Sequence, residues 1–146
     1  MLTGLAGGLS AQVTLALTQT PNVFPSPGSA DYSAGMITEP GGIVFTINSF
    51  GPANIVRTTT LFVRASSANL GGGKSLSDLE WRRADLTTWN AMTTADVLVE
   101  SRPVQKNQLN DPWSNTLFLR MHLNWVTDPP ATYSAGIVFT LTVTTP

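Results

Sequence analysis

The chain has 146 residues, which is the usual size of one domain and enough to bury a core without disulfides or structural metals. Only 12% of its residues are charged, about half of the usual share of roughly 25%. The 8 basic and 9 acidic residues leave a net charge of −1, which gives no electrostatic basis for binding nucleic acid or anionic lipid, so neither partner is expected. Cysteine is absent, which excludes disulfides and thiolate metal sites.

The N-terminal segment, residues 1–11, combines leucine, glycine and alanine and ends in a small residue, as the second half of a secretory signal does. We interpret it as the remnant of a secretory signal. The basic region with which such a signal begins is missing, since the first basic residue is Arg57, so a flexible N-terminus is the alternative. No other stretch approaches the roughly 20 apolar residues of a membrane span. Together with the Thr-rich and Ser-rich composition, this segment predicts a secreted or cell-surface protein.

Alternation of apolar and polar residues predicts a series of strands along the chain. The first covers residues 12–18, where Val13, Leu15 and Leu17 share one face, and a Pro-rich linker over 20–29 follows it. Further strands are predicted over 43–49, 59–65, 79–83, 96–101, 116–126 and 137–144, with short additions over 36–37 and 89–92. In the longest one, the predicted core face consists of Leu117, Leu119, Met121, Leu123 and Trp125.

Two short motifs occur twice. ADYSAGMI over 30–37 returns as ATYSAGIV over 131–138, and GIVFTI over 42–47 returns as GIVFTL over 136–141. Small residues precede an apolar strand in each case, so we expect a turn and then a strand at both ends of the domain.

Prolines and glycines separate the predicted strands and leave room for a helical turn only over 75–88. The number and spacing of the strands predict a single immunoglobulin-like antiparallel β-sandwich of seven to nine strands over residues 12–146. The strands that begin at Ile43 and Ile137 are expected to be central.

Candidate catalytic and metal-binding groups are few. His122 is the single histidine, and it shares the polar face of its strand with Arg120 and Asn124, where an ordinary surface imidazole is expected. The carboxylates lack calcium-loop spacing, and a zinc site would need a second histidine. No catalytic residue, metal or cofactor is therefore predicted.

The remaining enzymatic alternative is a carboxylate hydrolase, in which two acids converge beside Trp89 or Trp113. The candidate acids are Asp85, Asp96, Asp111 and Asp128.

Tryptophan is the residue type with a binding interpretation, because its ring can stack on the face of a sugar. Trp81 and Trp125 fall in the apolar register of their strands and are predicted to be buried. Trp89 and Trp113 lie among polar residues, where they either cap the open ends of the sandwich or contact a glycan. The candidate glycan site consists of Trp89, Asn110, Asp111, Trp113 and Asn115.

The closing segment, residues 133–142 (YSAGIVFTLT), resembles the last strand of secreted bacterial surface sandwiches. The similarity is to the WxL cell-wall-binding domain and to fimbrial and spore-coat-U type subunits, and it covers little more than this strand. Phe139 stands where the WxL pattern has tryptophan. The fimbrial resemblance implies donor-strand assembly, in which residues 11–18 of one subunit would complete the sheet of the next.

These observations predict a secreted, non-catalytic structural protein, a subunit of an extracellular fibre, pilus or surface layer. It would form a homo-oligomer or polymer by adding its N-terminal strand, with Val13, Leu15 and Leu17, to a neighbour's sheet edge. The alternative function is a glycan- or cell-wall-binding module with a polysaccharide as its partner.

Overall fold

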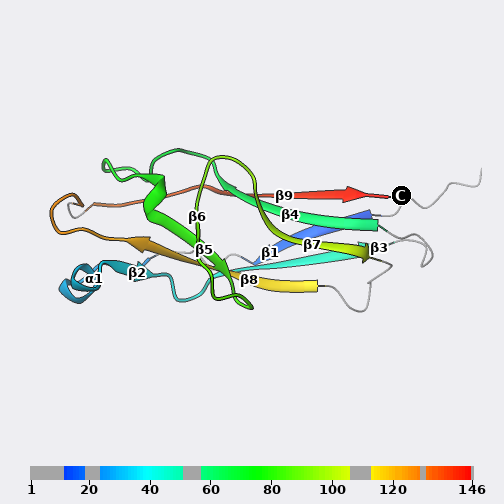
Figure 1. Ribbon diagram of the computed structural model, residues 1–146, viewed down its shortest axis with the longest axis horizontal. Coiled ribbons are helices and arrows are strands. Elements are labelled where there is room, and N and C mark those ends of the chain that lie inside the picture. Colours follow the sequence, from blue (N-terminus) through cyan, green and yellow to red (C-terminus); the bar gives the residue numbers. More distant parts are fainter. Residues whose placement is uncertain (1–11, 19–23, 51–56, 106–112, 129–130, 146) are drawn as a thin grey trace, which may run out of the picture.

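The computed structural model describes residues 12–18, 24–50, 57–105, 113–128 and 131–145. Figure 1 shows two layers of strands running along the long axis, with one short helix at an end. Within the described residues there are nine strands, and every pairing between them is antiparallel. The predicted antiparallel β-sandwich is therefore confirmed.

The larger sheet has six strands in the order β1-β3-β8-β5-β6, and β2 pairs with the end of β8 that β3 does not reach. Its members are β1 (Gln12–Thr18), β2 (Met36–Thr38), β3 (Ile43–Phe50), β5 (Leu79–Arg83), β6 (Asn90–Ala91) and β8 (Trp113–His122).

The smaller sheet has three strands in the order β7-β4-β9. They are β4 (Arg57–Ala65), β7 (Val97–Gln105) and β9 (Ile137–Thr144). The strand at Ile137 therefore lies at an edge, so the prediction that it is central was wrong, whereas β3 has a neighbour on each side.

The core lies between the sheets because each main strand turns every second residue inward. In β4 buried residues alternate regularly with half-buried ones. Phe45, Ile47, Leu61, Val63 and Leu117 have no exposed surface. Each such side chain contributes roughly 1.5–3 kcal/mol through removal of apolar area from water.

The turn between β2 and β3 depends on a buried carboxylate and a glycine. Glu39 accepts hydrogen bonds from the backbone N–H groups of Gly41 and Gly42. Gly42 has φ +69°, and a Cβ there would come within 2.5 Å of the Thr116 side chain. The glycine therefore allows β2 and β3 to follow one another along the same side of β8.

The repeated motif adopts two different conformations. In its first copy, Ser29–Ala34 form helix α1, which ends at Gly35 in the left-handed region. In its second copy, residues 131–136 have no regular secondary structure and lead into β9. The expected turn is thus replaced by a helix in the first copy and is not assigned in the second, although a strand follows both. The helical turn expected within 75–88 is present as the short 3-10 helix η1 (Leu76–Asp78).

Strand β8 lies three to four residues earlier than predicted. It ends at His122 because the side chains of Asn124 and Asp128 accept hydrogen bonds from backbone N–H groups and form a turn. Trp125 lies in this turn, is 61% exposed and stacks on Tyr32 with 4.6 Å between ring centroids. Its predicted burial was wrong, whereas the predicted burial of Trp81 is confirmed.

Candidate functional site

The predicted donor strand forms one edge of the larger sheet. All seven residues of β1 pair with β3, from Gln12 opposite Phe50 to Thr18 opposite Val44. Val13 and Leu15 are half-buried and pack against the core, and Leu17 is exposed. Within this chain, β1 therefore completes its own sheet, and β3 is the one described strand that it pairs with.

The two sheets are stacked so that β1 and β9 lie on the same side of the sandwich. Phe45 of β3 faces Phe139 of β9, with ring centroids 6.5 Å apart. On the other side, Arg83 of β5 donates a 3.0 Å hydrogen bond to the Val99 carbonyl of β7. The order β1 to β6 in one sheet therefore runs in the same direction as β9 to β7 in the other.

We call the side formed by β1 and β9 the open flank. Its two edge strands, QVTLALT and IVFTLTVT, have seven and eight residues and contain no charged residue and no proline. Among the described residues, no strand pairs with the outer side of β1 or of β9, so the backbone N–H and C=O groups on these sides can pair with an added strand. Long, uncharged edges of this kind are the usual sites at which another strand is added.

We call the opposite side, formed by β6 and β7, the blunted flank. Strand β6 has only two residues, and β7 carries Glu100, Arg102 and Pro103. The pairing of β7 with β4 contains two register shifts. Short strands, charges, proline and bulges are the features by which sheet edges resist pairing with another chain. The open flank is therefore the candidate functional site for self-association.

The candidate glycan site is not assembled on one exposed face. Trp113 is only 3% exposed, and its ring packs against Phe45 at 5.8 Å between centroids. The guanidinium of Arg102 lies 4.6 Å from the centre of the same ring. Trp113 is the first residue of β8 and is buried, which contradicts stacking on a sugar and agrees with the alternative in which it covers an end of the sandwich.

Trp89 is half-buried, and two guanidinium groups occupy its surroundings. Arg120 lies 4.4 Å and Arg82 5.1 Å from its ring centre, as in cation–π contacts. Asn115 donates a hydrogen bond to Asp85 and accepts one from the Thr116 backbone. Asn110 and Asp111 lie outside the described residues.

Three of the four candidate catalytic acids pair with different cations. Asp128 contacts Lys74 at 2.7 Å, and Asp96 contacts Arg64 at 3.4 Å. Asp85 pairs with Arg83, whose hydrogen bonds hold the pKa of this carboxyl well below its usual range. The described residues contain no group of three or more His, Asp or Glu side chains suited to a metal ion.

The single histidine belongs to an ionic cluster on the larger sheet. The carboxylate of Glu80 accepts from Arg120 at 2.5 Å and lies 3.0 Å from His122 Nε2. Burial alone would raise the pKa of Glu80, but the hydrogen bonds from Arg120 and His122 outweigh it and lower this pKa. These contacts connect β5 to β8.

A buried lysine is one of the polar features that sequence reasoning missed. Lys74 has 1% of its side chain exposed and contacts Asp128 at 2.7 Å and Asp78 at 3.1 Å. Burial alone would lower its pKa, but these two carboxylates raise it. The ion pair connects the loop before β5 to the turn after β8. Lys74 follows three glycines, a context that gave no sequence signal for burial.

Comparison of the chain with protein-family models, with curated proteins and with solved structures found no match. Among the described residues, no helix has the length and apolar character needed to span a membrane.

Proposed function

We propose that this protein is a non-catalytic structural subunit, secreted or carried at the cell surface, whose copies assemble by exchanging β1. In the assembly, β1 of one subunit pairs with β3 of the next, in the register that it has within its own chain. The observation that carries the proposal is the position of β1, an edge strand whose pairing with β3 another copy can reproduce.

Three further features support strand exchange. The segment that connects β1 to the rest of the chain contains prolines at positions 21, 25 and 27, which favour an extended linker over a tight hairpin. Val13 and Leu15 supply apolar side chains for the core of the receiving subunit. The outer edge of β9 lies on the same flank and offers a second uncharged strand to a neighbouring copy.

The energetic argument depends on the similarity of the two pairings. An exchanged β1 makes the same backbone hydrogen bonds and buries the same side chains as a β1 that pairs within its own chain. The difference in free energy between the exchanged and the unexchanged state is therefore small. Concentration and linker strain then determine the balance between monomer and polymer. Assembly is expected to increase with protein concentration.

A complementation experiment tests this proposal. A chain that lacks residues 1–20, refolded with a fluorescent peptide of residues 11–18, is expected to bind the peptide and to remain unpolymerised, while the full chain polymerises. A peptide with the same residues in scrambled order serves as the control. Equal binding of both peptides, or a full chain that stays monomeric at all concentrations, would contradict the proposal.

A further inference from the structure

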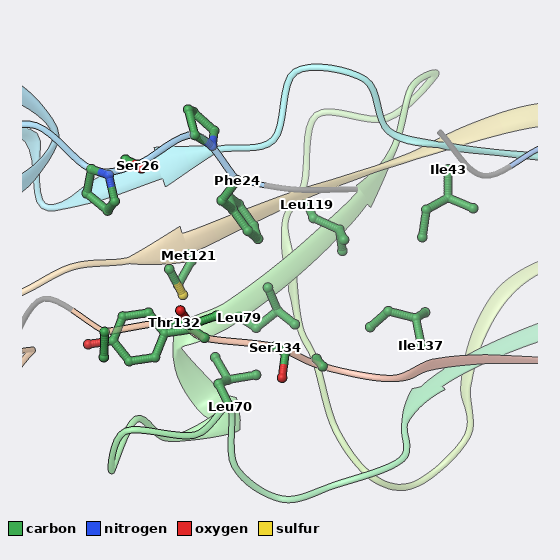
Figure 2. A pocket seen from close by; sticks show the side chains of 15 residues that line it. Phe24, Ser26, Ile43, Leu70, Leu79, Leu119, Met121, Thr132, Ser134 and Ile137 are labelled. Carbon is green, nitrogen blue, oxygen red and sulfur yellow. The ribbon is translucent and has the colours of Figure 1, made fainter. Parts of the chain in front are cut away.

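A cavity of about 560 Å³ lies between the sheets, next to the start of β9 (Figure 2). This volume falls within the range of about 300–1,000 Å³ that is typical of small-molecule sites. One wall is the inner face of the larger sheet, with Leu79, Leu119 and Met121. Residues 131–135 form the opposite wall, and residues 24–27 close part of the side.

The cavity is elongated along the strands. In Figure 2, Met121 and Thr132 lie toward one end, Ile43 and Ile137 lie toward the other, and Leu119 lies between them. Phe24 points into the cavity from the segment that follows β1. A space that extends along the strands in this way suits an extended chain better than a compact ring system.

The far wall is held away from the sheet by its own contacts. The Ser134 N–H donates a 2.8 Å hydrogen bond to the Leu70 carbonyl, and the Tyr133 ring packs so closely on Gly72 that a Cβ there would lie 3.0 Å from it. The Lys74 ammonium lies 5.8 Å from the centre of the Tyr133 ring. Because the neighbouring loop fixes these residues, the coil does not collapse onto the sheet.

The lining determines the chemistry of the ligand. Aliphatic side chains from both sheets surround the middle, and the lining also includes the hydroxyl-bearing residues Ser26, Thr132 and Ser134. No charged residue is among the lining residues of this cavity in the described part of the chain. A charged ligand group would therefore have no ionic partner among these residues, whereas a neutral polar group can hydrogen-bond to the hydroxyls.

We propose that this cavity binds a neutral, chain-like aliphatic molecule with a hydroxyl or ester head group, of the class of long-chain alcohols and their esters. The aliphatic chain lies between Leu119 and Ile137, and the head group lies near Thr132 and Ser134. Neither β1 nor the outer edge of β9 lines the cavity, whereas residues 24–27, which belong to the linker after β1, close part of its side.

The test uses parinaryl alcohol, a neutral, chain-like polyene dye that becomes fluorescent in apolar sites, with the full chain. The dye is expected to bind at one site per chain, and 1-decanol should displace it at concentrations about tenfold lower than decanoate or decylammonium. Absence of a saturable fluorescence increase would overturn the proposal. Displacement by the charged compounds at equal concentration would overturn the ligand class.

Two substitutions locate the dye. Thr132→Trp, at an exposed position of the wall, is expected to weaken dye binding by about tenfold by obstructing the cavity. Val126→Trp, in the turn after β8 and 91% exposed, is the matched control and should leave binding unchanged. Circular dichroism establishes that both variants are folded. Equal dye binding by both variants would overturn the proposal. Release of the dye as copies associate would also overturn it, because another copy would then fill the cavity.

Discussion

The two flanks of the sandwich treat their unpaired backbone groups in different ways. On the blunted flank, β7 carries a glutamate, an arginine and a proline. The edge strand of the other sheet on this flank, β6, is only two residues long. On the open flank, β1 and β9 are long and uncharged. Because both flanks belong to one fold, the difference lies in side chains and strand length, and the proposed self-association would use the open flank.

The flanks also differ in how they are attached. Strand β7 is held to the larger sheet by Arg83, which donates to the Val99 carbonyl and contacts Glu100 at 3.4 Å. Strand β1 is attached through its backbone ladder with β3 and the side chains of Val13 and Leu15. We therefore expect β1 to separate from the sandwich more readily than β7.

The largest expected effect on stability comes from a charge on the face of β1 that packs against the core. Leu15→Asp should lower the free energy of unfolding by about 2 kcal/mol, because it removes a half-buried apolar side chain and places a carboxylate against the core. The matched control is Leu98→Asp in β7, where the leucine is 53% exposed and little change is expected. Urea unfolding measures both, and equal losses would remove the distinction between the flanks.

Next in size is the effect of charge on the outer edges of the open flank. The double variant Leu17→Lys/Val143→Lys should weaken contacts between the outer edges of neighbouring copies by about tenfold, because like charges then meet at these edges. The β1–β3 pairing of the exchange itself should be unchanged. Both positions are already exposed, at 37% and 42%, so the fold should tolerate them. Leu86→Lys, at an equally exposed loop leucine, is the control. Light scattering over a dilution series should separate the variants.

A smaller effect is expected from removing charge on the blunted flank. Glu100→Gln/Arg102→Gln removes their 2.8 Å ion pair but leaves the proline, the bulges and the short β6 in place. Association should therefore increase by no more than about threefold. If association through the blunted flank rose to the level of association through the open flank, charge alone would be what protects the β7 edge. Sedimentation velocity provides the comparison.

The smallest expected effect concerns pH. The pKa values of Glu80 and Asp85 are lower in the folded chain than their ordinary values of 4.5 and 3.8. Their contribution to stability is therefore present above those ordinary values and is lost as pH falls through the lower folded values. Glu80→Gln should reduce the acid-induced loss by about 0.5 kcal/mol, given solvent screening of a partly exposed pair.

In the pH series, the pH dependence of association serves as the control for the pH dependence of stability. Strands β1 and β9 contain no titratable side chain, so dimer and polymer formation should change less with pH than stability does. Thermal unfolding of the parent and of Glu80→Gln between neutral and acidic pH supplies the measurement. Parallel curves for the two proteins would show that the Glu80 cluster does not contribute.

Much of the fold was predictable because it depends on local alternation. The bounds of β1, β5 and β9 were predicted to the residue. The end of β8 was not, because Asn124 and Asp128 stop the strand through side-chain hydrogen bonds that alternation does not register. Helix α1 was missed because it has only six residues, although Asp31 and Gly35 are recognisable capping residues.

The candidate sites were harder to predict, because they depend on packing between sheets. Trp113 has polar neighbours in sequence but faces Phe45 across the core side of the larger sheet, so its context misled the interpretation. The buried Lys74–Asp128 pair joins residues 54 positions apart, and spacing gives no indication of it. The edge position of β1 follows from sheet order, which strand patterns alone do not determine.

Strand exchange is tested most directly by disulfide trapping, because the chain contains no cysteine of its own. Ala16 and Thr46 lie opposite one another in the β1–β3 pairing. Chains with Ala16→Cys, mixed with chains with Thr46→Cys and oxidised, should form a disulfide-linked heterodimer. Asn48→Cys, which lies opposite Thr14 instead, is the out-of-register control for Thr46→Cys. Abundant heterodimer with Thr46→Cys and little with Asn48→Cys is the predicted result. Equal, low yields from both mixtures, together with complete closure of the disulfide in a single chain that carries both Ala16→Cys and Thr46→Cys, would show that β1 remains at home and would contradict the account.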